Sequence, residues 1–109
     1  MRLSPQERSA IAQAGAETLP AGSRVWLFGS RTDDAARGGD IDLLVETLAP
    51  LTPMEDVDLS TRFAARIQRH LGERRIDVVM TDTSGRDDRE IVRQARRRAL
   101  PLNANAAAA

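Results

Sequence analysis

The segment from residue 26 to residue 45 places the strongest constraint on the fold of this 109-residue chain. An apolar run ends in Gly29 and Ser30, a polar stretch rich in Gly and Asp follows, and a second apolar run begins with Asp40 and Asp42. Short runs of β-forming residues bounded by Gly, Ser and Asp are typical of strands. We therefore expect two strands that are joined through a turn of the size that holds a phosphate group.

Two helices are predicted from their first residues. Ser4 and Glu7 form a Ser-x-x-Glu capping box, and Thr52 and Glu55 repeat the pattern, each time with Pro at the first helical position. Apolar residues recur at every fourth place in the second of these helices, which predicts packing on a sheet. The expected elements are, in order, a helix at 5–16, strands at 24–28 and 40–46, a helix at 53–71, a strand at 75–81 and a helix at about 87–100.

Three finer expectations concern burial and the last helix. The unbroken apolarity of residues 24–28 predicts a strand buried on both faces, with Trp26 in the core. Asp87 is expected to cap the last helix, and Ile91, Ala95 and Ala99 are expected to face inward.

Together these elements predict an α/β fold with a small mixed sheet of three or more strands and about four helices, of which one is a single turn at 30–34. The length corresponds to one domain, which we place at residues 1–102. Residues 103–109 have low complexity, so we treat them as a disordered or cloning-derived tail and leave them out of the fold.

The composition excludes several kinds of site. The chain has no Cys and a single His, so thiol nucleophiles, disulfides and multi-histidine metal centres are absent, and a metal would require carboxylates. It also has no Lys, which excludes a Schiff-base lysine and a P-loop. A net charge of zero gives no support for nucleic acid as a direct substrate, and the lack of a long apolar run predicts a cytoplasmic protein with no membrane partner.

Asp40 and Asp42 are the first candidates for a metal site. Residues i and i+2 of a strand project to the same side, about 6.6–7 Å apart, so the two carboxylates can converge on a hard cation. Mg²⁺ is commonly held by one or two carboxylates together with phosphate oxygens, and two-metal sites place two ions about 3.5–4 Å apart.

Asp77 is the third candidate, because it interrupts the apolar strand at 75–81. A carboxylate buried there would be destabilising unless it were paired or bound to a metal. If this strand is a neighbour of the strand at 40–46, Asp77 completes a set of three acids. It would then bind the metal or accept the proton of an attacking hydroxyl.

Gly29, Ser30 and Arg31 are the candidates for phosphate binding. They lie at a predicted strand-to-helix junction and offer free backbone N–H groups, a hydroxyl and a guanidinium. Each part is a weak signal alone, since Gly-Ser is usually an ordinary turn and Asp-x-Asp is usually an exposed pair. Their order along the chain, followed by a third acid in a separate strand, is much more specific.

This combination of motifs, over residues 25–80, resembles the minimal nucleotidyltransferases of the DNA polymerase beta-like superfamily. The resemblance implies the palm fold of that superfamily, with the triphosphate on Gly29 and Ser30 and Mg²⁺ on Asp40, Asp42 and Asp77. One departure is Gly39, which stands where the superfamily often has Ser or Thr.

Members of this size resemble the antitoxins of two-gene modules whose toxin is a HEPN ribonuclease. That resemblance implies a Mg²⁺-dependent transfer of AMP from ATP to a hydroxyl of the toxin, often a tyrosine. Two alternatives stay open at this point: a vestigial nucleotide-binding module that inhibits a partner by binding alone, and a nucleotidyltransferase acting on an antibiotic-type small molecule. A homodimer or a hetero-oligomer is compatible with so small a sheet.

Overall fold

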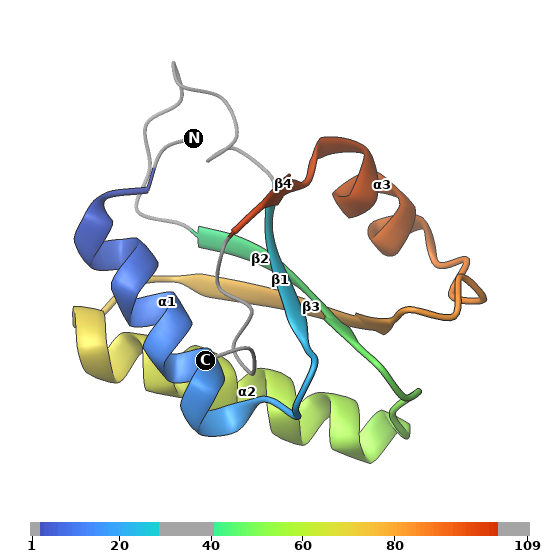
Figure 1. Ribbon diagram of the computed structural model, residues 1–109, viewed down its shortest axis with the longest axis horizontal. Helices are drawn as coiled ribbons and strands as arrows, with labels where there is room; N and C mark the ends of the chain where they lie inside the picture. The colour runs from blue at the N-terminus through green and yellow to red at the C-terminus, as the bar shows by residue number, and fades with distance from the viewer. Residues whose placement is uncertain (1–2, 29–40, 103–109) are drawn as a thin grey trace.

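A computed structural model describes residues 3–28 and 41–102 and forms one α/β unit (Figure 1). Its strands form a four-stranded mixed sheet in the order β3-β2-β1-β4, in which β2 and β3 are parallel and the other two pairs are antiparallel. The elements are α1 (Pro5–Thr18), β1 (Arg24–Phe28), β2 (Ile41–Thr47), α2 (Pro53–Leu71), β3 (Ile76–Asp82), α3 (Glu90–Arg98) and β4 (Leu100–Pro101).

The two predicted capping boxes are present. Ser4 Oγ accepts from the backbone N–H of Glu7 at 3.0 Å, and a Glu7 carboxylate oxygen accepts from the N–H of Ser4 at 2.9 Å. Thr52 and Glu55 make the same reciprocal pair at the start of α2. Gly72 ends α2 with φ of +90°, a backbone conformation that only glycine adopts without strain. The predicted bounds of α2 are therefore confirmed.

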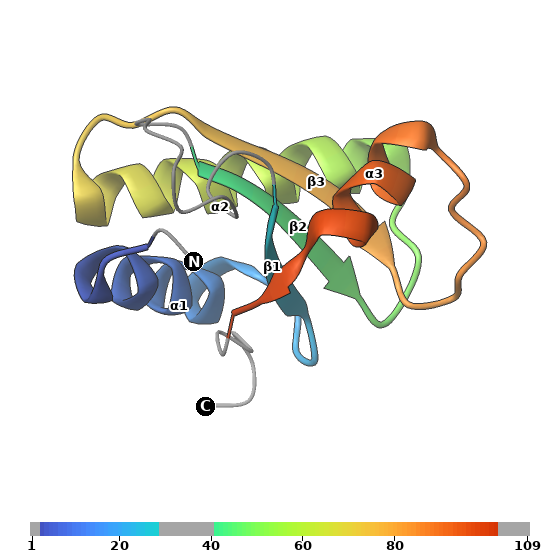
Figure 2. The same ribbon diagram turned by 90° about the horizontal axis from the view of Figure 1, so that it is seen from above.

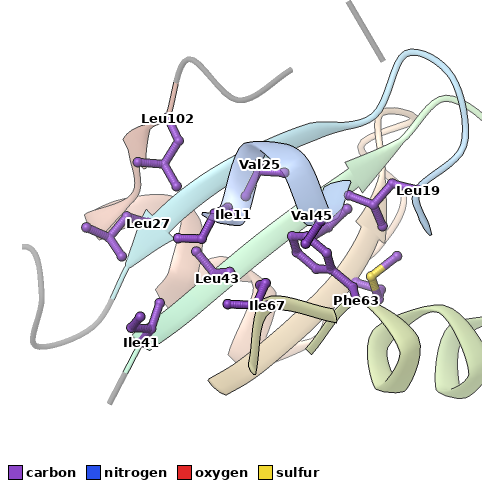
Figure 3. Packing of buried hydrophobic residues seen from close by; sticks show 12 residues of the cluster. Ile11, Leu19, Val25, Leu27, Ile41, Leu43, Val45, Phe63, Ile67 and Leu102 are labelled. Carbon is purple, nitrogen blue, oxygen red and sulfur yellow. The ribbon is translucent and has the colours of Figure 1, made fainter. Parts of the chain in front are cut away.

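The helices α1 and α2 cover one face of the sheet, and α3 lies on the other (Figures 1 and 2). The main core lies between the sheet and the first two helices, where alternate residues of the strands meet the inner faces of α1 and α2 (Figure 3). The core residues labelled in Figure 3 are Ile11, Leu19, Val25, Leu27, Ile41, Leu43, Val45, Phe63, Ile67 and Leu102. On the opposite face, where α3 contacts the sheet, Leu44 of β2 and Val92 and Ala95 of α3 are also buried.

Several details differ from expectation. The strand β1 is not buried on both faces, because Val25 and Leu27 face the core whereas Trp26 and Phe28 lie half-buried on the side of α3. In α3 it is Val92 and Ala95 that are buried, and Ile91 is 45% exposed. The short strand β4 was not predicted, since it is two residues long and owes its pairing to distant β1. Three helices lie within the described residues, and the predicted helical turn at 30–34 lies outside them.

None of the helices in the described part of the chain combines the length and the apolarity that crossing a membrane requires.

Candidate functional site

The strands β2 and β3 bring Asp42 and Asp77 side by side. The two residues are direct partners in the parallel register. Their neighbours Ile41, Leu43 and Val78 pack into or against the main core, so both aspartates lie on the opposite face of the sheet, away from α1 and α2. Adjacent strands lie about 4.8 Å apart, which is close enough for two carboxylates to bind one cation together.

The surroundings of Asp77 correct one step of the sequence argument. Asp77 is the second residue of an edge strand and its side chain is 48% exposed, so it does not lie in the buried middle of a strand as expected. Its carboxylate lies 3.5 Å from the Nε of Arg75, a side chain that is itself 72% exposed. Burial alone therefore does not require a metal at Asp77.

The placement of the two carboxylates is compatible with a bound cation, and Arg75 already supplies one positive charge beside Asp77. Like charges directly opposite one another on neighbouring strands destabilise a sheet, so a positive charge near the pair is favourable. Oxygen donors of this kind suit Mg²⁺, which usually takes one or two carboxylates and completes its shell with water and phosphate. The pair Asp42 and Asp77 therefore fits a magnesium site in the chemistry of its donors.

The pair is not a complete metal site by itself. Within residues 3–28 and 41–102 no three His, Cys, Asp or Glu side chains are grouped closely enough to hold an ion. The third predicted acid, Asp40, lies outside the described residues, as do the predicted phosphate-binding residues Gly29, Ser30 and Arg31.

The connection between β1 and β2 nevertheless starts and ends at this pair. Phe28, the last residue of β1, is the register partner of Asp42, and Ile41 is the first residue of β2. The chain therefore leaves and re-enters the sheet at the end that carries Asp42 and Asp77.

Further along the same face, a polar cluster holds α3 against the sheet. Glu46 is 8% exposed and accepts a hydrogen bond from Trp26 Nε1 at 2.8 Å, while its second oxygen lies 2.8 Å from Nη1 of Arg96. These contacts link β1, β2 and α3, and they direct the Nε1 edge of Trp26 toward Glu46. Sequence reasoning missed this role of Glu46, although its position four residues after Asp42 in one strand signals that the two share a face.

A pocket of about 410 Å³ lies at the other end of the sheet, near the end of β3 and the start of α2. It is lined by Leu51, Pro53, Asp56, Met80, Thr81, Asp82, Arg86, Asp87 and Arg89. Because β2 and β3 are parallel and Asp42 and Asp77 stand near their starts, this pocket is separated from the two aspartates by the length of the strands. It is therefore not part of the same site.

The carboxylate of Asp87 in that pocket has a structural role. It accepts a hydrogen bond from Thr81 Oγ1 at 2.7 Å and from Nη2 of Arg89 at 2.8 Å. The bond from Arg89, helped by that from Thr81, holds the pKa of Asp87 well below its ordinary value. The prediction that Asp87 caps the last helix is wrong: α3 begins at Glu90, and its N-cap residue makes no side-chain capping bond.

Comparison with known proteins gives similarity in structure only. No family model matches the sequence, and no curated protein matches it. A chain in a crystal structure described as a toxin–antitoxin with AMP-PNP is similar with a TM-score of 0.59 and 19% identity, over 87% of this chain and 71% of that one. A chain in a mutant of the toxin–antitoxin MntA-HpeT is similar with a TM-score of 0.55 and 19% identity, over 86% of this chain and 68% of that one.

Structural similarity at 19% sequence identity establishes the fold and nothing finer. The mixed four-stranded sheet with its three helices is the fold expected from the sequence motifs, and it is shared with chains of these toxin–antitoxin structures. The protein is thus an α/β chain whose fold is similar to that of chains in these toxin–antitoxin structures.

Proposed function

We propose that this protein is a Mg²⁺-dependent nucleotidyltransferase that transfers AMP from ATP to a hydroxyl group of a partner protein. We further propose that it acts as an antitoxin and that the modified partner is a HEPN ribonuclease toxin. The observation that carries the proposal is the register pairing of Asp42 with Asp77 on the face of the sheet away from α1 and α2. The AMP-PNP in one similar structure, an ATP analogue, supports an adenine nucleotide as the donor.

The reaction joins the acceptor oxygen to the α-phosphorus of ATP. The hydroxyl oxygen forms a new P–O bond, the bond from the α-phosphorus to the oxygen that bridges it to the β-phosphorus breaks, and pyrophosphate leaves. The hydroxyl proton passes to the carboxylate of Asp77, which lies half-exposed and so is accessible to an incoming hydroxyl.

The other residues have roles in binding. Asp40, Asp42 and Asp77 would hold Mg²⁺, whose charge neutralises the phosphates and the negative charge that develops during transfer. Gly29 and Ser30 would hold the triphosphate through backbone N–H groups and a hydroxyl, with Arg31 beside them. Phe28 and Ile41 anchor both ends of this segment next to the carboxylate pair.

The test is transfer of label. The protein is incubated with Mg²⁺, ATP labelled on the α-phosphate and the product of the neighbouring gene, and incorporation of label into that product is measured. We expect labelling by the wild type and none by the double variant Asp40→Ala, Asp42→Ala. Equal labelling by the two proteins would reject the assignment.

A second candidate is a vestigial site that neutralises its partner by binding alone. The contact between Arg75 and Asp77 favours it, because the chain then supplies its own cation to one of the carboxylates. In that case the double variant would still bind and silence the partner. Binding that persists while silencing is lost would eliminate this alternative.

A further inference from the structure

The outer edge of β3 has two halves that differ in whether their backbone hydrogen-bonding groups have partners. Among the described strands β3 pairs only with β2. The N–H of Ile41 donates to the carbonyl of Arg75 at 2.9 Å, and the N–H of Thr83 donates to the carbonyl of Thr47 at 3.0 Å. In a parallel ladder these two bonds require the odd-numbered residues of β3 to face β2. The backbone N–H and C=O groups of the even-numbered residues therefore point outward.

In the second half of this edge, arginine side chains donate hydrogen bonds to the outward carbonyl groups. Nη2 of Arg89 donates to the carbonyl of Met80 at 2.6 Å, and Nη2 of Arg96 donates to the carbonyl of Asp82 at 3.2 Å. For Ile76 and Val78, in the first half, the hydrogen bonds of the described residues include no comparable bond. An extended edge with unpaired groups is a template for another strand.

A groove of about 360 Å³ lies beside this open half, between β3 and α2. Its wall on α2 is made of small and polar side chains, namely Ser60, Thr61, Ala64, Ala65 and Gln68. On β3 it is lined by Ile76, Asp77 and Val78. An added strand would lie about 4.8 Å from β3, and the short side chains of α2 leave room for the residues that it would turn toward the helix.

We propose that an extended segment of the acceptor protein adds to β3 as a fifth strand at Ile76 and Val78. This inference rests on the proposed function and states how that site would select its acceptor. We identify the added strand as part of the acceptor because Asp77 lines the groove and also forms the carboxylate pair with Asp42. A strand seated here delivers its own side chains to the face on which the transfer takes place.

The alternation of a strand then specifies the acceptor sequence. Side chains of the added strand point alternately toward the groove on α2 and toward the face that carries Asp77. The acceptor is therefore a Ser, Thr or Tyr whose two neighbours in sequence have side chains that fit a wall of small and polar residues. The hydroxyl lies beside Asp77, and the two neighbours fill the space next to Ala64.

Two substitutions block the groove by different means. Ala64→Phe fills the space next to α2, and Val78→Pro removes an outward N–H that the ladder with β2 does not use. The matched control is Arg62→Phe, which adds the same ring to α2 on an exposed position outside the groove and removes only a surface ion pair with Asp58. Thermal unfolding checks that each variant is folded, and equilibrium dialysis checks that each still binds ATP.

The probe is the product of the neighbouring gene with ATP labelled on the α-phosphate. We expect the labelling rate at low acceptor concentration to fall at least tenfold in Ala64→Phe and Val78→Pro and to stay within twofold in Arg62→Phe. Unchanged labelling in both groove variants would overturn the inference and leave the proposed function standing. If the wild type itself transfers no label, the proposed function fails and this inference fails with it.

Amide hydrogen exchange of Ile76 and Val78 gives a readout that does not depend on transfer. We expect both amides to exchange rapidly in the free protein and to become protected when the partner is added, in wild type and in Arg62→Phe. Amides that stay unprotected in the complex would overturn the inference. So would amides that become protected in the free protein as its concentration rises, because a second copy of the chain would then occupy the edge.

Discussion

The two ends of the parallel pair β2 and β3 carry the same residue type in opposite settings. At the starting end, Asp42 and Asp77 are register partners, and the cation found beside Asp77 is the exposed Arg75 at 3.5 Å. At the finishing end, Asp87 is 15% exposed and is bound by both Thr81 and Arg89. The carboxylate of Asp87 is bound within the fold, whereas Asp42 and Asp77 stand side by side and Asp77 is half-exposed.

The largest effect expected from this difference is on the rate of AMP transfer. Under the proposed function, Asp77→Asn should lower the rate of AMP transfer by about 10²-fold or more, because it would remove both a proposed metal ligand and the proposed acceptor of the hydroxyl proton. Asp82→Asn, at the finishing end of the same strand, should change the rate less than about twofold. Rates are measured by incorporation of α-phosphate label. A similar loss in both variants would mean that the two ends do not differ in function.

The free energy of unfolding should depend more on Asp87 than on Asp77, which reverses the order expected for the transfer rate. Asp87→Ala leaves the hydroxyl of Thr81, a residue that is 6% exposed, without its acceptor and frees the guanidinium of Arg89. We expect a loss of about 1–3 kcal/mol in the free energy of unfolding, measured with urea. Asp77→Ala should stay within about 0.5 kcal/mol of the wild type, since its ion pair is exposed. A larger loss at Asp77 than at Asp87 would reverse the comparison.

Added Mg²⁺ should distinguish the two ends by a smaller amount. A ligand at ten times its dissociation constant stabilises the folded state by about 1.4 kcal/mol. The increase in melting temperature with Mg²⁺ should therefore appear in the wild type and in Asp87→Asn, and should be lost in Asp42→Asn. The metal alone is the probe, so this measurement requires neither ATP nor the acceptor. An equal increase in Asp42→Asn would place the ion elsewhere.

Local signals in the sequence predicted helix starts correctly where every partner of the capping residue is close in sequence. The capping boxes at Ser4 and Thr52 succeed because all their partners lie within three residues. The same reasoning fails at Asp87, where a hydroxyl from β3 and a guanidinium two residues away take the carboxylate that would have capped α3. Competition from a distant residue such as Thr81 is not visible in a local pattern.

The site was predictable only in part, and for a similar reason. Alternation along β2 indicates that Asp42 lies on the face opposite to Ile41 and Leu43, but it does not indicate which residue of another strand lies beside it. The register that pairs Asp42 with Asp77 joins strands separated in sequence by the whole of α2, which packs on one face of the sheet. The expectation that Asp77 is buried failed because β3 is an edge strand, a property of sheet order that the residues of β3 do not determine.

The smallest of these effects is expected from acid, at Asp87 of the finishing end. The pKa of Asp87 is lowered in the folded state by Arg89 and Thr81, so the folded state favours the ionised form more than the unfolded chain does. This contribution is fully present above the ordinary carboxyl pKa of about 4 and is lost as pH falls toward the lowered value. Between about pH 4 and pH 3 the wild type should therefore lose somewhat less than about 1 kcal/mol more than Asp87→Asn, in urea unfolding at each pH. Parallel pH profiles for the two proteins would show that the bonds from Thr81 and Arg89 do not favour the ionised carboxylate, and the two ends of the sheet would then differ in geometry alone.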